Sequence, residues 1–316
     1  MNVGRPRTRP PSSSSTAKAI ASSLSALLVL LTLGCGAASS PTAVPAAVAA
    51  APSPTPAPSP KVAVISVDGL RPDAFAKAQA PEIRKLMARG VFTLRAKTVL
   101  PAVTLPAHAS MLTGVEPSVH RILWDDYEPD RGAVSVPTIF AIARASGLRT
   151  VAVVGKEKLH TLAVPGTVDS FVVVSRGDAE VANQAIVEAG VGFDLLFVHF
   201  PDVDLTGHAQ AWMSPAYMAA IEAADVAIGR LVAALPPQTT VIVTADHGGK
   251  DRTHGTDIPE DRTIPWVIAG PGVPAHGEMS SEVNQVDTAA TALWVLGLRL
   301  PDGGAAQVVQ EAFANP

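Results

Sequence analysis

Aspartate and histidine side chains recur in this sequence in short, ordered groups. They are Asp68, Asp204 with His208, Asp246 with His247, and His254. Carboxylates and imidazoles without cysteine are the ligands expected for a catalytic zinc or manganese ion rather than for structural zinc. The spacing of Asp204 and His208, i and i+4, places both on one face of a helical turn. The pattern therefore predicts metal-assisted chemistry.

The adjacent pair Asp246 and His247 suggests that more than one ion is involved. Neighbouring side chains at a strand end point to opposite sides, so this pair could serve two metals or lie between them. Two metals ~3.5–4 Å apart stabilise the attacking and leaving oxygens of an in-line displacement. Such a site needs a nucleophile. Thr104 offers a hydroxyl in a proline-bracketed segment before an expected helix start, whose backbone N–H groups could bind a phosphate.

Several of these residues also have a structural explanation. Asp68 could begin a turn with Gly69, a common sequence after a strand. Asp202 competes with Asp204 as a ligand, although the spacing to His208 favours Asp204. Thr104 could cap a helix, and a nucleophile at a helix start could also occupy that position.

The elements that must position these groups are short and regular. Apolar, non-alternating runs predict buried strands at 62–67, 150–154, 193–200 and 240–244. Helical patterns lie between and around them, at 81–89, 136–145, 179–188 and 215–235, with Pro137 suited to a first turn. This alternation predicts an α/β fold with a doubly wound, mostly parallel central sheet and helices on both faces.

Ligands of such sheets bind beyond the carboxyl ends of the strands. Three of the four predicted strands run directly into the aspartate and histidine groups. The fourth runs into Lys156 and Lys158, which could be a solvated charge cluster but lie at the edge where ligands bind. We therefore expect all these side chains at one rim of the sheet.

The first 60 residues are expected to lie outside the fold. Basic residues precede an apolar run over 24–33, followed by Gly34 and Cys35, the one cysteine among 316 residues. This arrangement predicts a signal peptide over 1–35, because the run is shorter than the ~20 residues of a membrane-spanning helix. The segment resembles a bacterial lipoprotein signal, in which Cys35 is lipidated; plain cleavage and secretion is the alternative.

Residues 36–60 contain seven prolines and nine alanines and no charged residue. Such a stretch predicts an extended linker ahead of a catalytic domain over 61–316. The whole chain carries a net charge of -4, and the loss of the four basic residues in 1–34 leaves 20 basic against 28 acidic ones, or -8. This charge argues against a nucleic-acid-binding surface, and the single cysteine excludes a disulfide framework. We expect an exported, periplasmic or cell-surface protein attached to the membrane by a lipid.

The motifs together resemble the alkaline phosphatase superfamily, and are most similar to its type I phosphodiesterase/nucleotide pyrophosphatase branch. The similarity spans five segments in unbroken order, at 67–69, 104–108, 204–208, 245–248 and 253–255. It implies two zinc ions, with manganese as an alternative. Asp204, His208 and His254 would hold the first ion. The second would be held by Asp68, Asp246, His247 and the oxygen of Thr104.

The resemblance also implies a mechanism. The metal-activated Thr104 hydroxyl would attack phosphorus, and the resulting phosphothreonine would be hydrolysed by water. Lys156 and Lys158 would stabilise the non-bridging phosphate oxygens, as similar lysine pairs do in phosphonoacetate hydrolases. The remaining histidines are expected to be structural or surface residues; they are His108, His120, His160, His199 and His276.

Asp125 departs from the family pattern, because relatives usually carry at this position an asparagine that donates a hydrogen bond to phosphate. An ionised aspartate only accepts hydrogen bonds and would repel phosphate unless it is protonated or turned away. Asp125 is therefore a candidate substrate-binding residue, and Asp125→Asn is expected to raise turnover of a phosphodiester.

These features favour hydrolysis of a small phosphodiester or pyrophosphate. A phosphomonoesterase or phosphonate hydrolase of the same superfamily is the enzymatic alternative, since two lysines suit a more negative substrate. A transferase with an alcohol acceptor and a surface-anchored binding protein without turnover are further alternatives. A sulfatase is disfavoured because that branch modifies a cysteine or serine nucleophile. The short linkers predict an open cleft with a minimal cap.

Overall fold

The computed structural model describes residues 59–301 and 304–313. The predicted signal peptide, Cys35 and nearly all of the linker lie outside the described residues, so those predictions stay predictions. Among the helices of the described part, none combines the length and the apolar character needed to cross a membrane.

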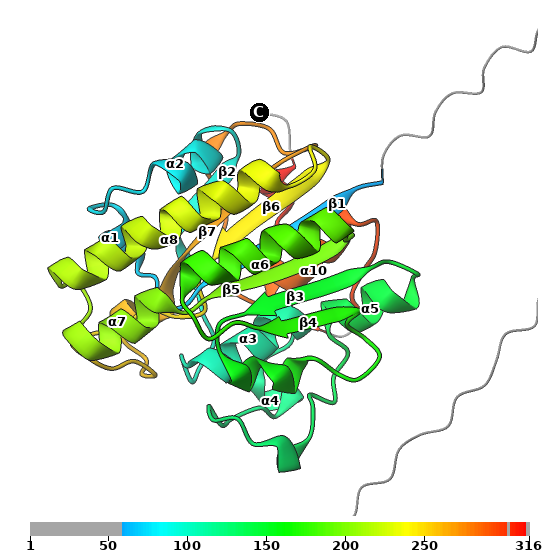
Figure 1. Cartoon of the computed structure of the whole chain (residues 1–316), viewed down its shortest axis with the longest axis horizontal. Helices are drawn as coiled ribbons and strands as arrows, with labels where there is room; N and C mark the ends of the chain where they lie inside the picture. The colour runs from blue at the N-terminus through cyan, green and yellow to red at the C-terminus, as the bar shows by residue number, and fades with distance from the viewer. Residues whose placement is uncertain (1–58, 302–303, 314–316) are drawn as a thin grey trace, which may run out of the picture. The chain divides into compact units, whose positions relative to one another are not determined.

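Eight strands form one mixed sheet in the order β4-β3-β5-β1-β6-β7-β2-β8 (Figure 1). Their bounds are β1 Lys61–Val67, β2 Val91–Lys97, β3 Thr150–Val154, β4 Ser170–Val173, β5 Leu195–Phe200, β6 Thr239–Thr244, β7 Thr263–Ala269 and β8 Gly277–Glu278. The five strands from β4 to β6 pair in parallel. Strand β7 is antiparallel to both β6 and β2, while β2 and β8 pair in parallel. The expected α/β fold with a mostly parallel sheet is confirmed.

The strands missed by the sequence patterns lie mainly toward the edges of the sheet. Strand β2 alternates buried with less buried positions and contains Arg95 and Lys97, and β7 contains Pro265, which argues against a strand in sequence-based reasoning. The predicted strand over 193–200 begins two residues later, at Leu195. The central strands were predicted because both of their faces are covered, which leaves a continuous apolar run.

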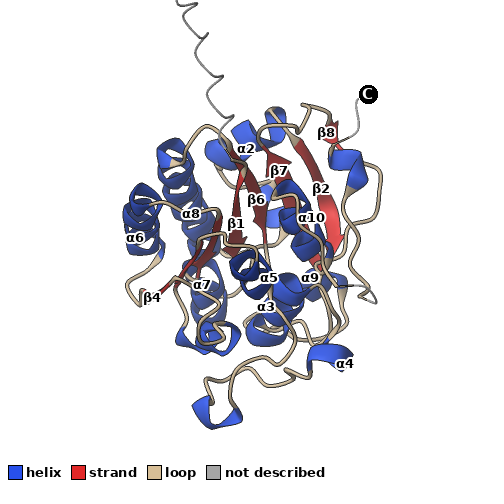
Figure 2. Cartoon of the chain, turned by 90° about the vertical axis from the view of Figure 1, so that its right-hand side faces the viewer, coloured by secondary structure: helices blue, strands red, loops and turns tan. Residues whose placement is uncertain are grey.

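Helices cover both faces of the sheet (Figure 2). One face carries α6 Asp178–Val191, α7 Asp202–Gln210 and α8 Pro215–Ala234, and the other carries α3 Thr104–Thr113, α5 Ile139–Ala145 and α10 Asp287–Val295. The shorter helices are α1 Pro72–Phe75, α2 Pro81–Ala88, α4 Pro117–His120 and α9 Pro259–Arg262, with 3₁₀ turns at Pro129–Arg131, Glu157–Leu162 and Gln310–Ala312. The long helix α8 starts where the sequence predicts, because the Ser214 side chain accepts a hydrogen bond from the Tyr217 N–H.

The start of α5 differs from the prediction. Pro137 does not lie in its first turn, because the helix begins at Ile139. Thr138 caps it instead, and its hydroxyl oxygen accepts a hydrogen bond from the Ala141 N–H at 3.3 Å. A side-chain cap thus sets this boundary rather than the fixed φ of proline.

The register between β1 and β5 places their carboxyl ends side by side. Ser66 pairs with His199, and Val67 with Phe200. Strand β6 is the parallel neighbour of β1 on its other side, and β3 is the neighbour of β5. The residues that follow these four strands must therefore meet at one edge of the sheet.

Two aspartates join the starts of helices α6 and α7. The Asp178 N–H donates to Asp202 Oδ2 at 2.9 Å, and the Asp202 N–H donates to Asp178 Oδ1 at 3.0 Å. Asp178 is buried, and its Oδ2 has no hydrogen-bond partner. Burial and the Asp202 carboxylate raise the pKa of Asp178 to about 8. This contact anchors α7, which carries two of the candidate metal ligands.

The raised pKa predicts a stability cost at alkaline pH. The folded chain keeps a proton on Asp178 that the unfolded chain releases above pH ~4, so this group lowers the free energy of unfolding as the pH rises from about 4 to about 8. The asparagine in Asp178→Asn does not titrate. We therefore expect the free energy of unfolding of this variant to exceed that of the wild type by about 2 kcal/mol at pH 9 and to equal it near pH 4. Urea unfolding at both values measures this, and an equal difference at both would contradict it.

Candidate active site

The predicted chemical residues follow the carboxyl ends of neighbouring parallel strands. Asp68 follows β1, the pair Asp246 and His247 follows β6, and Lys156 follows β3. Helix α7, which supplies Asp204 and His208, follows β5 directly. The structure thus brings together the residues that the sequence analysis expected at one rim.

Each of the three carboxylates in this cluster has one oxygen held by the protein and one without a partner. Asp68 Oδ2 lies 2.8 Å from His199 Nε2, and Asp204 Oδ2 lies 2.6 Å from Lys156 Nζ. Asp246 Oδ1 accepts hydrogen bonds from the backbone N–H groups of Gly69 and His247. The other oxygens, Asp68 Oδ1, Asp204 Oδ1 and Asp246 Oδ2, are buried and make no hydrogen bond. Unpartnered buried carboxylate oxygens are costly unless a cation coordinates them.

The three histidines of the cluster are oriented in the same way. The Nδ1 atoms of His208, His247 and His254 each lie within 2.7–3.0 Å of a backbone carbonyl oxygen. Since a carbonyl only accepts, Nδ1 must carry a proton and donate it. A neutral ring then leaves Nε2 with a lone pair, and Nε2 of buried His247 has no hydrogen-bond partner. This second-layer contact is the usual way to orient a metal-binding imidazole.

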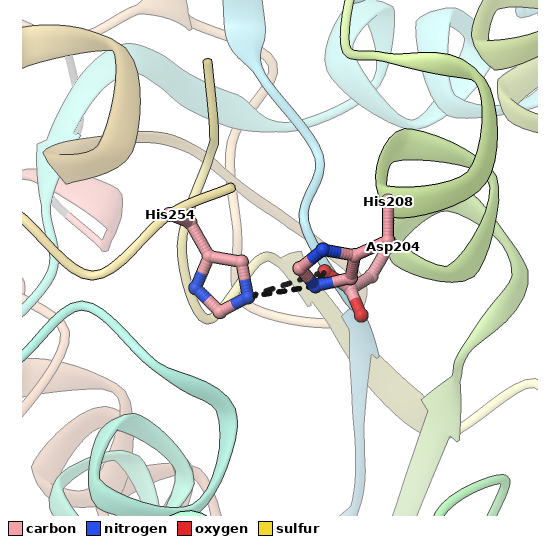
Figure 3. Close-up of side chains that lie close together, drawn as sticks. All are labelled: Asp204, His208 and His254. Atoms are coloured by element: carbon pink, nitrogen blue, oxygen red, sulfur yellow. Dashed lines mark hydrogen bonds and ion pairs between the residues drawn. The ribbon is translucent and has the colours of Figure 1, made fainter. Parts of the chain in front are cut away.

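The first group of ligand atoms belongs to α7 and the loop after β6 (Figure 3). His254 Nε2 lies 3.1 Å from His208 Nε2 and 3.6 Å from Asp204 Oδ1. His208 Nε2 lies 3.4 Å from Asp204 Oδ1. Ligands of a tetrahedral zinc ion, each 2.0–2.1 Å from the metal, lie about 3.3 Å apart. These three residues fit one such ion.

The second group surrounds His247. Its Nε2 lies 3.3 Å from both Asp68 Oδ1 and Asp246 Oδ2. Asp68, Asp204 and His247 also form a set of converging ligand atoms, so Asp204 stands between the two groups. The Asp246 and His247 side chains converge instead of pointing to opposite sides, because β6 ends at Thr244 and the pair lies in the turn that follows.

Gly69 permits this close approach. Its φ is +72°, a conformation that side chains other than glycine rarely adopt, and a Cβ there would lie 3.0 Å from the Asp204 Cα and Cβ atoms. The Gly69 carbonyl accepts hydrogen bonds from Trp212 Nε1 at 2.9 Å and from the Tyr217 hydroxyl at 2.6 Å. The turn that presents Asp68 is therefore fixed from both sides.

The electrostatics of the cluster favour cations. Burial alone would raise the pKa of Asp68, but Lys156 and His199 hold that pKa well below its usual value. Burial and the Asp68 carboxylate raise the pKa of Asp246 to about 7. Although burial lowers it, the Asp246 and Asp68 carboxylates raise the pKa of His247 to about 10. A metal ion would replace such bound protons as the counter-charge.

Thr104 is the first residue of α3, and its hydroxyl lies 3.5 Å from Asp68 Oδ2 and 3.3 Å from Lys156 Nζ. The cap residue of this helix is Val103, so Thr104 does not serve as the cap. Its hydroxyl is buried beside the second group, where a metal-activated nucleophile would need to be.

Asp202 and Asp204 have separate surroundings. Asp202 faces the start of α6 through Asp178, whereas Asp204 faces the cluster. The geometry agrees with the choice of Asp204 from its spacing to His208.

The two lysines make different contacts. Lys156 Nζ lies 2.7 Å from Asp68 Oδ2 and 2.6 Å from Asp204 Oδ2. Lys158 Nζ lies 2.8 Å from Asp125 Oδ2, and Asp125 Oδ1 accepts the Leu105 N–H at 2.8 Å. Asp125 therefore occupies the backbone amide next to Thr104, in the first turn of α3, where an incoming phosphate oxygen could otherwise bind.

Three residues that contact the cluster were not assigned to it from sequence: His199, Trp212 and His108, whose Nδ1 lies 3.5 Å from Asp246 Oδ2. His199 was expected to be structural, yet its Nε2 lies next to Asp68, and its Nδ1 accepts the Gly155 N–H at 3.3 Å. Its position as a polar residue in an apolar run was the available signal. Trp212 lies edge-on to His208 and His254, and no sequence pattern marked it.

The other histidines support neighbouring elements. His108 contacts the Thr104 carbonyl oxygen and Ser66 Oγ, under the nucleophile. His120 Nε2 lies 2.9 Å from Ser110 Oγ at the start of the loop that carries Asp125. His160 packs against Phe171.

The sequence matches a known family model. A model described as type I phosphodiesterase / nucleotide pyrophosphatase matches residues 62–266. That range includes all the candidate site residues discussed above.

Curated relatives match over shorter stretches. A phosphopentomutase from Rhizobium etli is 31% identical over 123 residues, and a GPI ethanolamine phosphate transferase 1 from Gibberella zeae is 29% identical over 156 residues. These alignments cover 36% and 41% of this chain. The chain spans only 30% and 16% of the respective relatives.

Solved structures confirm the fold. Murine ectonucleotide pyrophosphatase / phosphodiesterase 5, an inactive variant in complex with AMP, matches with a TM-score of 0.71 at 16% identity, over 81% of this chain and 100% of that one. A phosphonate monoester hydrolase from Silicibacter pomeroyi matches with a TM-score of 0.61 at 16% identity, over 80% and 76% of the two chains. Both share the alkaline phosphatase-like fold expected from the motifs.

The position of Asp125 predicts the effect of its replacement. Asp125→Asn removes a negative charge next to Thr104, and Asn can still accept the Leu105 N–H, so we expect turnover of bis-p-nitrophenyl phosphate to rise about fivefold, or about 1 kcal/mol. Asp126→Asn, an exposed neighbour, is the matched control and should leave turnover unchanged. A rate that stays equal or falls in Asp125→Asn would remove Asp125 from the substrate-oxygen site.

Proposed function

Because the chain belongs to the type I phosphodiesterase / nucleotide pyrophosphatase family, we propose that it is a two-metal phosphohydrolase that cleaves phosphodiester or pyrophosphate bonds. Family membership itself supports a phosphoester hydrolase. The observation that carries the finer proposal is the set of four buried, unpartnered ligand atoms beside the Thr104 hydroxyl, on Asp68, Asp204, Asp246 and His247.

The residues present fit two divalent cations, which we propose to be zinc, with manganese as the alternative. Asp204, His208 and His254 would hold one, and Asp68, Asp246, His247 and Thr104 the other. When bound, the ions would act as Lewis acids on the phosphate and lower the pKa of the attacking hydroxyl.

The chain's own residues contribute position and charge. The start of α3 places Thr104 Oγ1 3.5 Å from the Asp68 carboxylate, and both side chains are buried. Deprotonated Thr104 is the proposed nucleophile, which forms a phosphothreonine ester as the alcohol leaves. Water then attacks phosphorus and breaks the bond between phosphorus and Thr104 Oγ1, so that the phosphate product is released and Thr104 Oγ1 regains a proton.

Asp125 supports a diester rather than a monoester as substrate. Its carboxylate occupies the Leu105 amide, so a negative group is already present beside the nucleophile. A dianionic monoester would be repelled more strongly than a monoanionic diester. The alternative of a phosphomonoesterase or phosphonate hydrolase is favoured by Lys158, which adds a positive charge at the same place.

Location and partners belong to the same proposal. A lipid anchor at Cys35 would hold the enzyme outside the cytoplasm, where its substrate would be a small phosphate ester. The phosphopentomutase and transferase relatives make an alcohol acceptor in place of water a further reaction to test.

The nucleophile is tested by Thr104→Ala, with Thr104→Ser as the control that keeps a hydroxyl. We expect two metal ions per chain in all three proteins, and about a thousandfold or greater loss of bis-p-nitrophenyl phosphate hydrolysis in the alanine variant, with partial activity in the serine variant. Metal analysis and rates with added zinc or manganese provide the measurement. A protein that binds two metal ions yet shows the same rate with and without Thr104 would favour a binding protein, with the measured rate due to a contaminant.

Substrate charge is tested by comparing the diester with p-nitrophenyl phosphate, followed by a panel of nucleotides and phosphonates. We expect the wild type to prefer the diester and Asp125→Asn to reduce that preference, because the repulsion acts mainly on the dianion. A wild type that prefers the monoester would establish the alternative.

A further inference from the structure

The ammonium group of Lys156 lies among three oxygen atoms of the protein. Its Nζ lies 2.7 Å from Asp68 Oδ2, 2.6 Å from Asp204 Oδ2 and 3.3 Å from Thr104 Oγ1. A lysine ammonium has three N–H donors and no acceptor. Hydrogen bonds to Asp204 Oδ2 and Thr104 Oγ1 use two of these donors, and the Asp68 carboxylate forms an ion pair with the same ammonium, so three protein oxygens surround Lys156 Nζ.

Lys156 contacts only one of the two oxygens of each carboxylate and leaves the other oxygen available to a metal ion. Lys156 contacts Oδ2 of Asp68 and Oδ2 of Asp204, while Oδ1 of each is buried without a partner. Each Oδ1 is also the atom that faces the histidines, at 3.3 Å from His247 Nε2 for Asp68 and 3.4 Å from His208 Nε2 for Asp204. The ammonium and a metal ion would thus coordinate different oxygens of the same side chains.

We propose that Lys156 is a fixed internal cation that links the two candidate metal groups to the Thr104 hydroxyl, and that it does not bind substrate. This inference rests on the proposed two-metal function. It replaces the expectation that both lysines stabilise phosphate oxygens, and it leaves that role to Lys158, whose Nζ contacts only the Asp125 carboxylate in the described part of the chain.

The charge of the cluster explains why such a cation would be built in. Three carboxylates, of Asp68, Asp204 and Asp246, are buried close together and repel one another. An ammonium between two of them holds their oxygens at ligand positions before any metal arrives. The same positive charge repels incoming divalent ions. Lys156 would therefore stabilise the clustered carboxylates in the metal-free protein and weaken the binding of metal ions.

The experiment compares Lys156→Met with Lys158→Met, its neighbour two positions along the chain. Manganese binding is followed by isothermal titration calorimetry of metal-free protein, and the Tm is measured with and without manganese. We expect Lys156→Met to bind manganese about tenfold more tightly than the wild type, because one repelling charge is gone. Its Tm should fall without metal and recover with metal. Lys158→Met should bind manganese as the wild type does.

Inorganic phosphate supplies the readout for substrate binding. Because the Lys156 ammonium already contacts three protein oxygens, its loss should leave the inhibition constant of phosphate within about threefold of the wild type, while turnover falls about a hundredfold through the Thr104 hydroxyl. If Lys156→Met does not fold, Lys156→Gln, which removes the charge but keeps an amide donor, should show the same tighter manganese binding.

Unchanged manganese affinity and unchanged metal-free Tm in Lys156→Met would overturn the inference, as would a phosphate inhibition constant raised tenfold or more. Failure of the wider function gives a different result. A wild type that binds no manganese or zinc would refute the two-metal proposal, and the linking role of Lys156 would then be judged by the Tm of the metal-free variants.

Discussion

The repulsion among three buried carboxylates is the constraint on which the rest of this site depends. Asp68, Asp204 and Asp246 lie after three neighbouring strands and are all buried, and burial together with the Asp68 carboxylate raises the pKa of Asp246. One oxygen of each carboxylate has a partner in the protein. The Lys156 ammonium contacts Asp68 and Asp204, a histidine contacts Asp68, and backbone N–H groups donate to Asp246. The remaining negative charge would favour a bound cation at this site.

The architecture around the cluster serves this arrangement. Gly69 brings β1 close to α7, and the paired aspartates at the starts of α6 and α7 fix the helix that carries Asp204 and His208. Backbone carbonyls orient three imidazoles, so that their Nε2 atoms face the carboxylates. His199 contacts the Asp68 carboxylate, and Trp212 donates a hydrogen bond to the carbonyl of Gly69 in the same turn. Rigid support of this kind is what precise metal geometry requires.

The two lysines lie two positions apart in the sequence but contact different carboxylates. Lys156 faces inward to the carboxylates and the nucleophile, whereas Lys158 is paired with Asp125 at the first turn of α3. That second pair places opposite charges where the substrate phosphate would bind, and so ties the choice between diester and monoester to residues outside the metal ligands. The ectonucleotide pyrophosphatase / phosphodiesterase 5 and phosphonate monoester hydrolase structures share the fold of this chain, and a shared fold does not by itself fix the substrate.

The sequence alone determined the fold class, the central strands and the identity of the clustered residues, because buried parallel strands are continuous apolar runs and ligands follow their carboxyl ends. Spacing also selected Asp204 over Asp202. Only the tertiary structure decided what each atom contacts. It joined Lys156 to Asp68 and Asp204, placed Asp125 on the Leu105 amide, and made His199 a partner of Asp68. These contacts connect residues 20 to 131 positions apart, and no local pattern of hydrophobicity or propensity records which oxygen meets which donor across such distances.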